Sequence, residues 1–595
     1  MNIILNNVLP LLSGLALFLF GMDLMGDSLK KSAGSRLRTI LGKMTSNPVK
    51  GFLLGLVVTG IIQSSSATTV MVVGFVNSGT MTLLQSVGVI MGANVGTAVT
   101  AWLTGLSGIE SESADKALGI VQLLKPDTWV PIIAVIAICL LMFVKRGKKR
   151  DVGFILIGFA ILMVGMDLMS GAVKDLRDDL APLFTMFENP FLGVLVGLVL
   201  TAIVQSSSAS VGILQALTVS GSITYGAAIP IIMGQNIGTC VTALISSISA
   251  NKNGKRAALI HLYFNIIGVV VWLSLFYLFN SIFTFKLGGI PLVDKTIDMW
   301  GVAAVHTIFK LLSVLLMAPF YRQLEKLSRL TIKDDASESG AEETVNLLDE
   351  RLFETPAIAV ARATEVTGVM AEISCRALKN SLTLFDNYDA KLADEIRLLE
   401  DKADMYEDAL GTYLVKLSAK DMDEHESREI TKLLHIIGDY ERISDHAVNV
   451  LESAEEMREK KLAFSAGAQN ELCVLRSAVS DILTLTEQAF RENSVKLAGD
   501  VEPLEQVVDD LRDKIKLNHV LRLQKSECTI EHGFILADLL NNFERVSDHC
   551  SNIAGCVIEI SSYNVLEMHK YLAKVKHGSE QFDEKYKEYK KKYVF

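Results

Sequence analysis

The sequence predicts an all-α protein in which a polytopic membrane domain is followed by a soluble helical domain. Of the 595 residues, 50% are hydrophobic, and the mean hydropathy is +0.35. Up to about Tyr321, apolar segments of membrane-spanning length alternate with short polar joints, and beyond it charged residues are dense. Each half also contains an internal duplication. We therefore expect two inverted membrane repeats with re-entrant helical hairpins, followed by two three-helix bundles.

A short polar motif, Gln-Ser-Ser-Ser-Ala, marks the duplication in the membrane half. It occupies residues 63–67 and returns at residues 205–209, each time inside an apolar run that contains glycine. Four consecutive polar side chains are costly at membrane depth unless the protein uses them. Each motif is therefore predicted to form the tip of a hairpin made of two half-helices.

The first repeat, about residues 11–105, begins with a span from Leu11 to Met25. Basic residues follow that span, which places the N-terminus outside the cell. The segment 52–76 is the first predicted hairpin, entered from the cytoplasm. The next span, 83–103, contains the motif Gly92-Ala-Asn-Val-Gly-Thr97.

The second repeat, about residues 152–248, follows an extra span at 129–144 that ends in a strongly basic, cytoplasmic stretch. An odd number of crossings separates the starts of the two repeats, so they must be inverted. Further spans are expected at 257–279 and 300–320. Inverted repeats with matching interruptions indicate a secondary transporter with its site near the midplane, although channels share part of this pattern.

The duplicated polar positions are the candidate binding site for an anion and its coupling cation. A half-helix that begins inside the membrane presents free N–H groups and a positive dipole end, while serine and glutamine can bond either ion. The alternative is that these serines only help helices to pack. The candidates are Gln63, Ser64, Ser65, Ser66, Thr68, Asn94, Thr97, Gln205, Ser206, Ser207, Ser208, Asn236 and Thr239.

Two further features of the membrane half have open interpretations. The glycines of the asparagine motifs permit backbone unwinding and carbonyl exposure, as sodium sites require, but glycines also serve close helix contact. Asp23 and Asp167 are acids in apolar segments, which makes them ion-site candidates, or they lie at span ends where a carboxylate is tolerated. His306 and Trp272 are expected to be packing residues.

Charge and motif content limit the function classes. A net charge of −10 argues against nucleic acid as a partner. No Gly-x-x-x-x-Gly-Lys-Ser/Thr stretch is present, so we expect a transporter that is not an enzyme. Importing a divalent anion into a negative-inside cell costs about 4.6 kcal/mol per 100 mV, and two Na⁺ ions would cancel that charge.

The soluble half is expected to begin after an acidic linker at 331–350 and to occupy 351–595, with helical units at about 351–456 and 466–563. Acidic residues recur on shared helix faces and could hold metal ions, or they could form a salt-bridged seam with Arg442 and Arg545. The candidate ligands are Glu400, Asp404, Glu441, Asp445, Glu505, Asp509, Glu544 and Asp548.

The paired Gln-Ser-Ser-Ser motifs and the asparagine motifs resemble those of the type II sodium-phosphate cotransporter family. The repeated Glu-Arg-x-x-Asp-His at 441–446 and 544–549 makes the second half similar to the PhoU family. The resemblance implies Na⁺-driven movement of inorganic phosphate, with residues 63–66 and 205–208 contacting phosphate and sodium. It also implies a regulatory domain with divalent or iron-type metal ions. Asp439 corresponds to Asn542, so the two metal sites are expected to differ.

The leading hypothesis is a sodium-coupled phosphate symporter of a bacterial inner membrane, in contact with lipid and modulated by its cytoplasmic C-terminal domain. That domain could also mediate a homodimer or bind a signalling partner. A phosphate exporter or channel, and a membrane-anchored phosphate or metal sensor, are the alternatives, because polar half-helix sites fix neither substrate nor direction.

Overall fold

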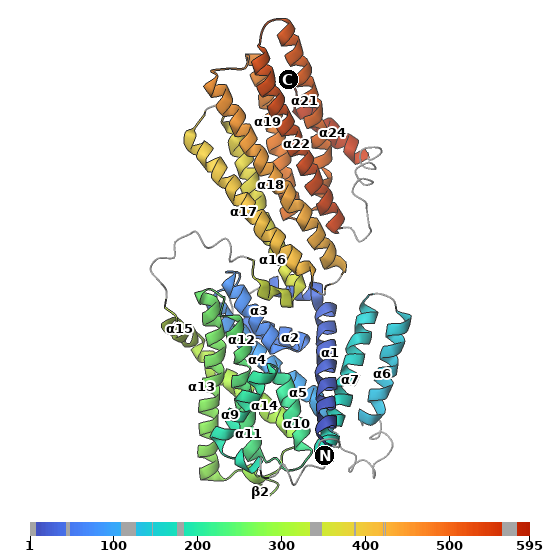
Figure 1. The fold of residues 1–595 in the computed structure, drawn as a ribbon, viewed down its shortest axis with the longest axis vertical. Helices are drawn as coiled ribbons and strands as arrows, with labels where there is room; N and C mark the ends of the chain where they lie inside the picture. The colour runs from blue at the N-terminus through green and yellow to red at the C-terminus, as the bar shows by residue number, and fades with distance from the viewer. Residues whose placement is uncertain are drawn as a thin grey trace. The chain divides into compact units, whose positions relative to one another are not determined.

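The chain forms two compact units, residues Met1–Ala357 and Ile358–Phe595, in a computed structural model (Figure 1). The predicted all-α class is confirmed, since the described residues contain helices and one short two-stranded ribbon. The expected limits 1–330, 331–350 and 351–595 stay predictions, and most of that linker lies outside the described residues. The structure describes residues 7–42, 48–108, 126–144, 147–174, 182, 184–333, 348–385, 388–420, 422, 424–561 and 580–595.

The first unit is built from helices of two length classes, which correspond to full spans and half-spans. The helices are α1 Leu9–Gly42, α2 Pro48–Ile62, α3 Ser65–Asn77, α4 Leu83–Gly96, α5 Ala98–Gly105, α6 Pro126–Phe143, α7 Lys148–Lys174, α9 Pro190–Val204, α10 Ser207–Thr218, α11 Tyr225–Gly238, α12 Cys240–Ser246, α13 Lys252–Phe283, α14 Met299–Met317 and α15 Tyr321–Thr331. Short 3-10 helices are η2 Leu106–Gly108, η4 Leu292–Asp294, η5 Ala318–Phe320 and η7 Glu350–Glu354. Strands β1 Lys286–Leu287 and β2 Ile290–Pro291 pair antiparallel between α13 and α14.

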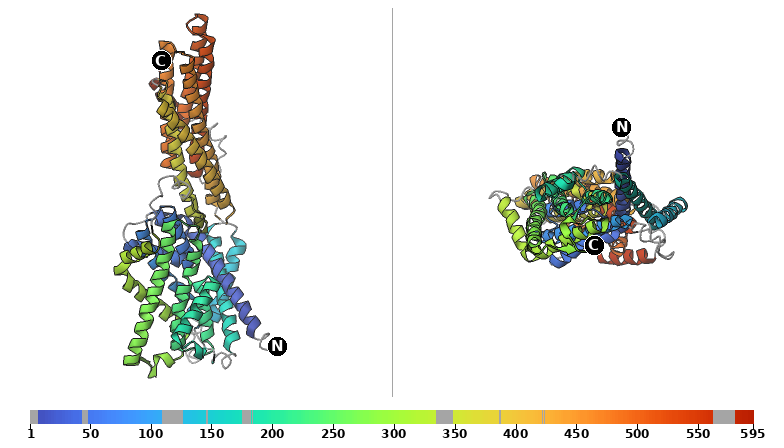
Figure 2. Two further views of the ribbon diagram at one scale, coloured as in Figure 1. Left: turned by 60° about the vertical axis from the view of Figure 1, so that its left-hand side comes forward. Right: turned by 90° about the horizontal axis from the view of Figure 1, so that it is seen from below.

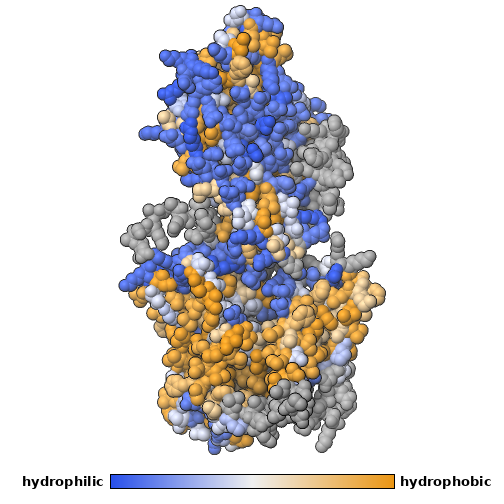
Figure 3. Space-filling model, viewed as in Figure 1, coloured by the Kyte–Doolittle hydropathy of each residue, from blue (hydrophilic) through white to orange (hydrophobic). Residues whose placement is uncertain are grey.

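Six helical stretches of this unit are long and apolar enough to cross a membrane, and four shorter apolar helices, including α2 and α9, accompany them. The surface of the unit is apolar, as the orange atoms in Figure 3 show. Phe143, Phe191 and Ile203 each leave more than three quarters of their surface exposed. Such exposure suits lipid and not water, so the first unit is a multi-pass membrane domain.

Glycines hold the helices of this domain together at backbone distance. A methyl group on Gly21 would lie 2.4 Å from the Leu162 nitrogen, and one on Gly165 would lie 2.4 Å from the Phe18 nitrogen, so α1 and α7 cross in direct contact. Small residues allow this approach, which dispersion forces stabilise where no hydrophobic effect drives association. Phe18 is fully buried beside this crossing in a core with Met163 and Met166.

The sequence duplication is also a duplication of local structure. In the first copy α2, a break and α3 are followed by α4 and α5, and in the second α9, a break and α10 are followed by α11 and α12. Thr59 and Thr68 hydroxyls are 3.0 Å apart across the first break, and Thr201 and Ser210 hydroxyls are 2.8 Å apart across the second. Re-entry into the bilayer and opposite membrane orientations of the two copies stay predictions.

The second unit consists of long helices that run side by side (Figure 2). Each predicted sequence unit supplies three of them, and α24 is a further helix near the C-terminus. The helices are α16 Pro356–Thr383, α17 Ala390–Ser418 and α18 Glu424–Glu459 in the first, and α19 Ala466–Arg491, α21 Val501–Gln524 and α22 Ile530–Ser561 in the second, with short α20 Val495–Gly499 and terminal α24 Glu580–Lys592.

Gly92→Ala tests the backbone-distance packing of α4 on α2. A methyl group at Gly92 would lie 1.9 Å from the Phe52 carbonyl oxygen, so the helices must separate, and we expect a destabilisation of about 1–3 kcal/mol or more. The measurement is the apparent melting temperature of the detergent-solubilised protein. Gly60→Ala on α2 is the matched control, because nothing lies within 4 Å of its added methyl group. Equal melting temperatures for the two variants would contradict this account of the packing.

Candidate functional site

Each polar motif lies where one half-helix ends and the next begins. Gln63 and Gln205 adopt left-handed backbone angles, with φ of 58° and 55°, and so end α2 and α9. The hydroxyls of Ser64 and Ser206 then accept the Ala67 and Ala209 amides at 3.1 and 3.2 Å and cap the next helices. This N-cap bond satisfies one of the helix's first amides and leaves the others available to a ligand.

The two motifs meet at one place. The Oγ atoms of Ser65 and Ser207 lie 3.4 Å apart, although 142 residues separate them in sequence. A cavity of about 280 Å³ opens beside this contact. Its lining includes all eight Gln-Ser-Ser-Ser residues of the two motifs, Gln63, Ser64, Ser65, Ser66, Gln205, Ser206, Ser207 and Ser208. The N-terminal ends of α3 and α10 therefore converge on a cavity large enough for a small anion.

The cavity combines anion-binding groups with acidic side chains. Two helix N-termini direct amides and the positive ends of their dipoles at it, and serine hydroxyls can donate to phosphate oxygens. Its remaining wall includes the carboxylates of Asp23, Asp27 and Glu354 and the Lys30 ammonium, which is ion-paired with Asp27 at 3.0 Å. The charged side chains thus carry a formal excess of two negative charges, which favours cations beside any bound anion.

The two glutamines have different environments. Gln63 is buried, and its side-chain oxygen accepts the Thr100 hydroxyl at 2.8 Å. Gln205 is exposed, and the hydroxyl of Thr242, the counterpart of Thr100, instead donates to its own helix at the Thr239 carbonyl, 3.0 Å away. The first motif is therefore tied to α5, whereas the second has no equivalent tie to α12 among the described residues.

The other candidate residues of the membrane domain are buried but lie outside the cavity wall. The Asn94 and Asn236 amides donate to carbonyls of their own helices, at Ile90 and Ile232, and the Thr97 hydroxyl donates to the Ala93 carbonyl. Thr239 likewise bonds back to Gln235, and Thr68 bonds across the hairpin to Thr59.

The expected unwinding of the asparagine motifs is slight. Thr97 keeps helical angles, with φ −62° and ψ −25°, between α4 and α5. The motif glycines instead allow close contact, since methyl groups on Gly92 and Gly234 would lie 1.9 and 2.0 Å from carbonyl oxygens of α2 and α9. Of the two acids in apolar segments, Asp23 lines the cavity and Asp167 does not.

Comparison with known proteins agrees with this architecture. Residues 17–171 and 177–288 match the Na⁺/Pi-cotransporter family, and residues 368–454 and 474–557 match the PhoU domain. The chain belongs to the Na⁺/Pi-cotransporter family. It is a phosphate transporter-family protein with a C-terminal PhoU region.

Curated relatives of this cotransporter-family chain come from bacteria and animals. It is 24% identical over 559 residues to the "putative inorganic phosphate export protein YjbB" of Escherichia coli K12, covering 93% of this chain and 97% of that protein. It is 32% identical to the uncharacterized protein YqeW of Bacillus subtilis, over 44% and 82% of the two chains. Human sodium-dependent phosphate transport protein 2B is 35% identical over about a fifth of each chain. No solved structure matches the chain significantly.

A segment just before the PhoU region is seated on the cotransporter domain. Asp349 accepts the Asn77 amide of α3 at 2.7 Å, and Arg351 donates to the Ser246 carbonyl and the Ser249 hydroxyl, both at 2.8 Å. Leu352 is fully buried in this contact. Glu354, which also lies in η7 and follows Leu352 by two residues, lines the motif cavity. The linker prediction did not include this docking, and the mixed acidic composition of the segment gave little signal for it.

A second feature outside the predicted site is Lys310, a buried lysine in the span that α14 forms. Its Nζ donates to the Asn94 carbonyl oxygen at 2.7 Å. An ionisable residue inside an apolar span is a functional candidate by default, so the signal was present in the sequence.

The predicted acidic ligands form two stripes in the PhoU region, one in each of its two helical sequence units, and the stripes differ. The first stripe contains Glu400, Asp404, Glu441 and Asp445, and the second contains Glu505, Asp509, Glu544 and Asp548. In the second, Arg512 forms ion pairs with Asp509 at 3.3 Å, with Asp513 at 2.9 Å and with Glu544. Glu407 occupies the corresponding position of the first unit, which therefore lacks this neutralising cation. The sequence alternative to metal binding was a salt-bridged seam with Arg442 and Arg545. In the second stripe it is Arg512 that forms such a seam, with Asp509, Asp513 and Glu544.

The first stripe is an acidic cluster with weak compensation, since the exposed Arg442 lies 3.5 Å from Glu441 and 3.9 Å from Asp445. Burial and the neighbouring Asp445 raise the pKa of Glu441 to about 7. Burial, Asp401, Asp404 and Asp445 raise the pKa of Glu400. Oxygen ligands of this kind suit a hard divalent cation, but among the described residues no three of His, Cys, Asp and Glu converge as metal ligands. Metal binding by Glu400, Asp404, Glu441 and Asp445 stays a prediction.

The Asp439 and Asn542 pair marks a contact between the two PhoU units. His549 Nδ1 lies 2.8 Å from Asp439, and His446 Nδ1 lies 2.8 Å from Asn542, so each partner comes from the other unit. The two histidine rings are 5.7 Å apart. The Asp439 and Asn542 difference therefore lies at the seam between α18 and α22, and the expected difference between the two metal sites stays a prediction.

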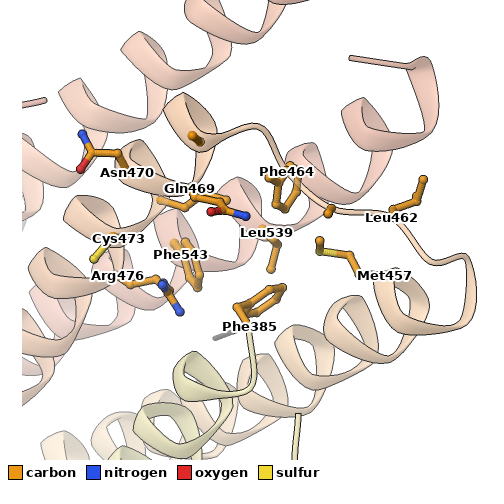
Figure 4. Close-up of a pocket in the computed structure, with 13 residues that line it drawn as sticks. Phe385, Met457, Leu462, Phe464, Gln469, Asn470, Cys473, Arg476, Leu539 and Phe543 are labelled. Carbon is orange, nitrogen blue, oxygen red and sulfur yellow. The ribbon is translucent and has the colours of Figure 1, made fainter. Parts of the chain in front are cut away.

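A larger cavity of about 540 Å³ lies inside the PhoU region and is unrelated to the predicted sites (Figure 4). Apolar side chains such as Phe385, Phe464 and Leu539 line it. The Arg476 guanidinium at its edge donates to the Leu382 carbonyl at 2.7 Å. With a mainly apolar wall and no carboxylate, this cavity offers neither the metal ligands nor the anion site that the sequence predicts.

Glu441→Gln tests the electrostatics of the first acidic stripe. Burial raises the pKa of Glu441 in the folded state from its ordinary value of 4.5 to about 7, so its contribution to stability is present below pH 4.5 and is lost as pH rises through 7. We expect the variant to exceed the wild type by about 1–2 kcal/mol at pH 8, after allowance for partial exposure, and to match it near pH 4.5. Urea unfolding of residues 358–595 measures this difference.

Glu544→Gln in the second unit is the matched control for Glu441→Gln. It removes a carboxylate that is ion-paired with Arg512, so it should give no stabilisation at pH 8. Identical pH profiles of the wild type and Glu441→Gln would show that burial and repulsion of Glu441 in the first stripe do not destabilise the folded state at pH 8.

Proposed function

We propose that this protein is a sodium-coupled transporter of inorganic phosphate, and not an enzyme, in a bacterial inner membrane. Its N-terminus would lie outside and its PhoU region in the cytoplasm. The observation that carries the proposal is the meeting of the two motifs at Ser65 and Ser207, 3.4 Å apart, beside one cavity. Phosphate would be bound by the serine hydroxyls and the first amides of α3 and α10.

The charge of the cavity supports cation coupling. A divalent phosphate next to Asp23, Asp27 and Glu354 would be repelled unless cations entered with it. Moving that phosphate inward against a negative-inside potential costs about 4.6 kcal/mol per 100 mV, which entering sodium ions would offset. Sodium also appears in the names of the animal relatives.

Export is the second candidate direction. The relative that covers 93% of this chain is named a putative phosphate exporter, and outward movement of a dianion from a negative-inside cell is favoured by voltage. Proteoliposomes with radiolabelled phosphate separate the candidates. Accumulation only with an inward Na⁺ gradient supports symport, efflux from loaded vesicles without that gradient supports export, and no movement under any gradient supports a sensor.

Ser65→Ala and Ser207→Ala test the shared site. Each should lower sodium-driven phosphate uptake at least tenfold, since a loss of one charge-assisted hydrogen bond of about 1.5–3 kcal/mol changes binding by that order. Ser86→Ala is the matched control, because that buried hydroxyl bonds the Leu83 carbonyl away from the cavity. Uptake at the wild-type rate in both motif variants would mean that the serines only pack helices.

We also propose that the PhoU region modulates transport through the docked segment 348–355. Glu354 places a carboxylate in the cavity that phosphate would occupy. Because this carboxylate would repel phosphate, the docked segment would inhibit transport. A partner or metal that changes the PhoU region would then act by releasing this segment, through the chain continuity of η7 with α16.

Arg351→Ala tests this modulation. Loss of the bonds to Ser246 and Ser249 should free the segment and raise the initial rate of uptake several-fold. Glu354→Gln should have the same direction, because it removes the competing charge. Arg329→Ala, which breaks an exposed pair with Glu325, is the matched control. Lower uptake in both Arg351→Ala and Glu354→Gln would show that the segment supports transport and does not restrain it.

A further inference from the structure

A group of polar side chains is buried between α13 and α14, away from the motif cavity. Lys310, His306, His261 and Asn265 each have at most 3% of their surface exposed. They lie in two helices that are long and apolar enough to span the membrane. A charged ammonium in such a place is costly, so it requires a compensating partner or a function.

Lys310 is compensated by a backbone carbonyl and by no carboxylate. Among the described residues, its Nζ has one hydrogen-bond acceptor, the Asn94 oxygen at 2.7 Å, and no ion pair. Asn94 lies two residues before α4 ends at Gly96. Carbonyls at a helix C-terminus carry partial negative charge, and in discontinuous transporter helices such carbonyls hold the coupling cation. The ammonium therefore occupies the kind of position that a sodium ion would take.

Among the residues that the structure describes, no lysine or arginine occupies the equivalent position in the second repeat. The carbonyl oxygen of Asn236, the counterpart of Asn94, lies 3.7 Å from the Cys240 thiol, and that thiol is closer to the His261 carbonyl oxygen, at 3.5 Å. That thiol is fully buried and accepts the Asn265 amide at 3.3 Å. The corresponding carbonyl of the second repeat therefore faces a weak, neutral donor, and it can still accept a mobile cation.

Several polar atoms around Lys310 have no hydrogen-bond partner in the described part of the chain. Both ring nitrogens of His261, Nδ1 of His306 and the Ser313 hydroxyl are buried without a hydrogen bond. Buried polar atoms are seldom left unsatisfied, so each such group calls for a ligand or water. This is a second, independent sign that the region handles polar or charged species.

We propose that Lys310 is a built-in cation that takes the place of one sodium ion at the asparagine motif of the first repeat. The mobile sodium ion of this repeat pair then binds at the Asn236 motif. The part of this inference that concerns mobile sodium rests on the proposed sodium coupling. The replacement of an ion by Lys310 can be tested without it.

Lys310→Gln removes the charge and keeps an amide that can donate to the Asn94 carbonyl. We expect the purified full-length variant to bind one more ²²Na⁺ ion per chain at equilibrium than the wild type. Phosphate transport by the variant should rise more steeply with Na⁺ concentration. Lys310→Arg retains the charge and should bind as many sodium ions as the wild type. Lys326→Gln neutralises an exposed lysine and is the matched control.

The outcomes separate this inference from the proposed function. If the wild type ignores sodium and Lys310→Gln acquires sodium dependence, the inference holds and sodium coupling of the wild type fails. If Lys310→Gln is folded and binds the same number of sodium ions as the wild type, the inference is overturned, whether or not phosphate moves. If Lys310→Gln does not fold, sodium binding by Lys310→Met is measured in the same way. If neither neutral variant folds and Lys310→Arg folds normally, the charge of Lys310 is purely structural and the inference is overturned.

Discussion

The structure depends on one constraint, which is that backbone amides inside an apolar unit must find partners. The chain breaks two helices at Gln63 and Gln205 and starts new ones at Ser65 and Ser207. Serine caps satisfy only one amide at each start. The amides that remain are costly in an apolar medium and favourable beside an anion. Glycine crossings of α2 with α4 and of α9 with α11 bring the half-helices close enough to hold both breaks in place.

The two copies share a backbone plan but differ in their chemistry. Gln63 is bonded to Thr100, whereas Gln205 is exposed and Thr242 bonds its own helix. Lys310 faces one asparagine carbonyl and Cys240 faces the other. Identical repeats would offer the cargo two equal sites. These differences give the copies different charge and different accessibility, so the two repeats are chemically unequal around the cavity that they share.

Much of the membrane fold could be predicted from the sequence, because a duplication with a constant offset repeats every constraint at once. The hairpin tips and their convergence follow from the polar breaks in apolar runs. The asparagine motifs were less predictable: an Asn side chain in a helix can serve an ion or its own carbonyl four residues back, and Asn94 and Asn236 do the latter. In the PhoU region, spacing placed the acids on shared faces, but only the packing shows that Arg512 neutralises one stripe while Glu407 adds to the other.

The position of Glu354 in the wall of the motif cavity supports the proposal that the PhoU region modulates transport. A regulatory signal must change the free energy with which the cavity binds its ligand. A change in distant helices does this only if a contact couples them to the cavity. Asp349 and Arg351 fix the segment to α3 and to Ser246 at the end of α12, which belong to different repeats. A movement of one repeat against the other would therefore strain these bonds. The same segment places the Glu354 carboxylate in the wall of the cavity. Release of the segment would therefore break these bonds and also remove a negative charge from beside the serines.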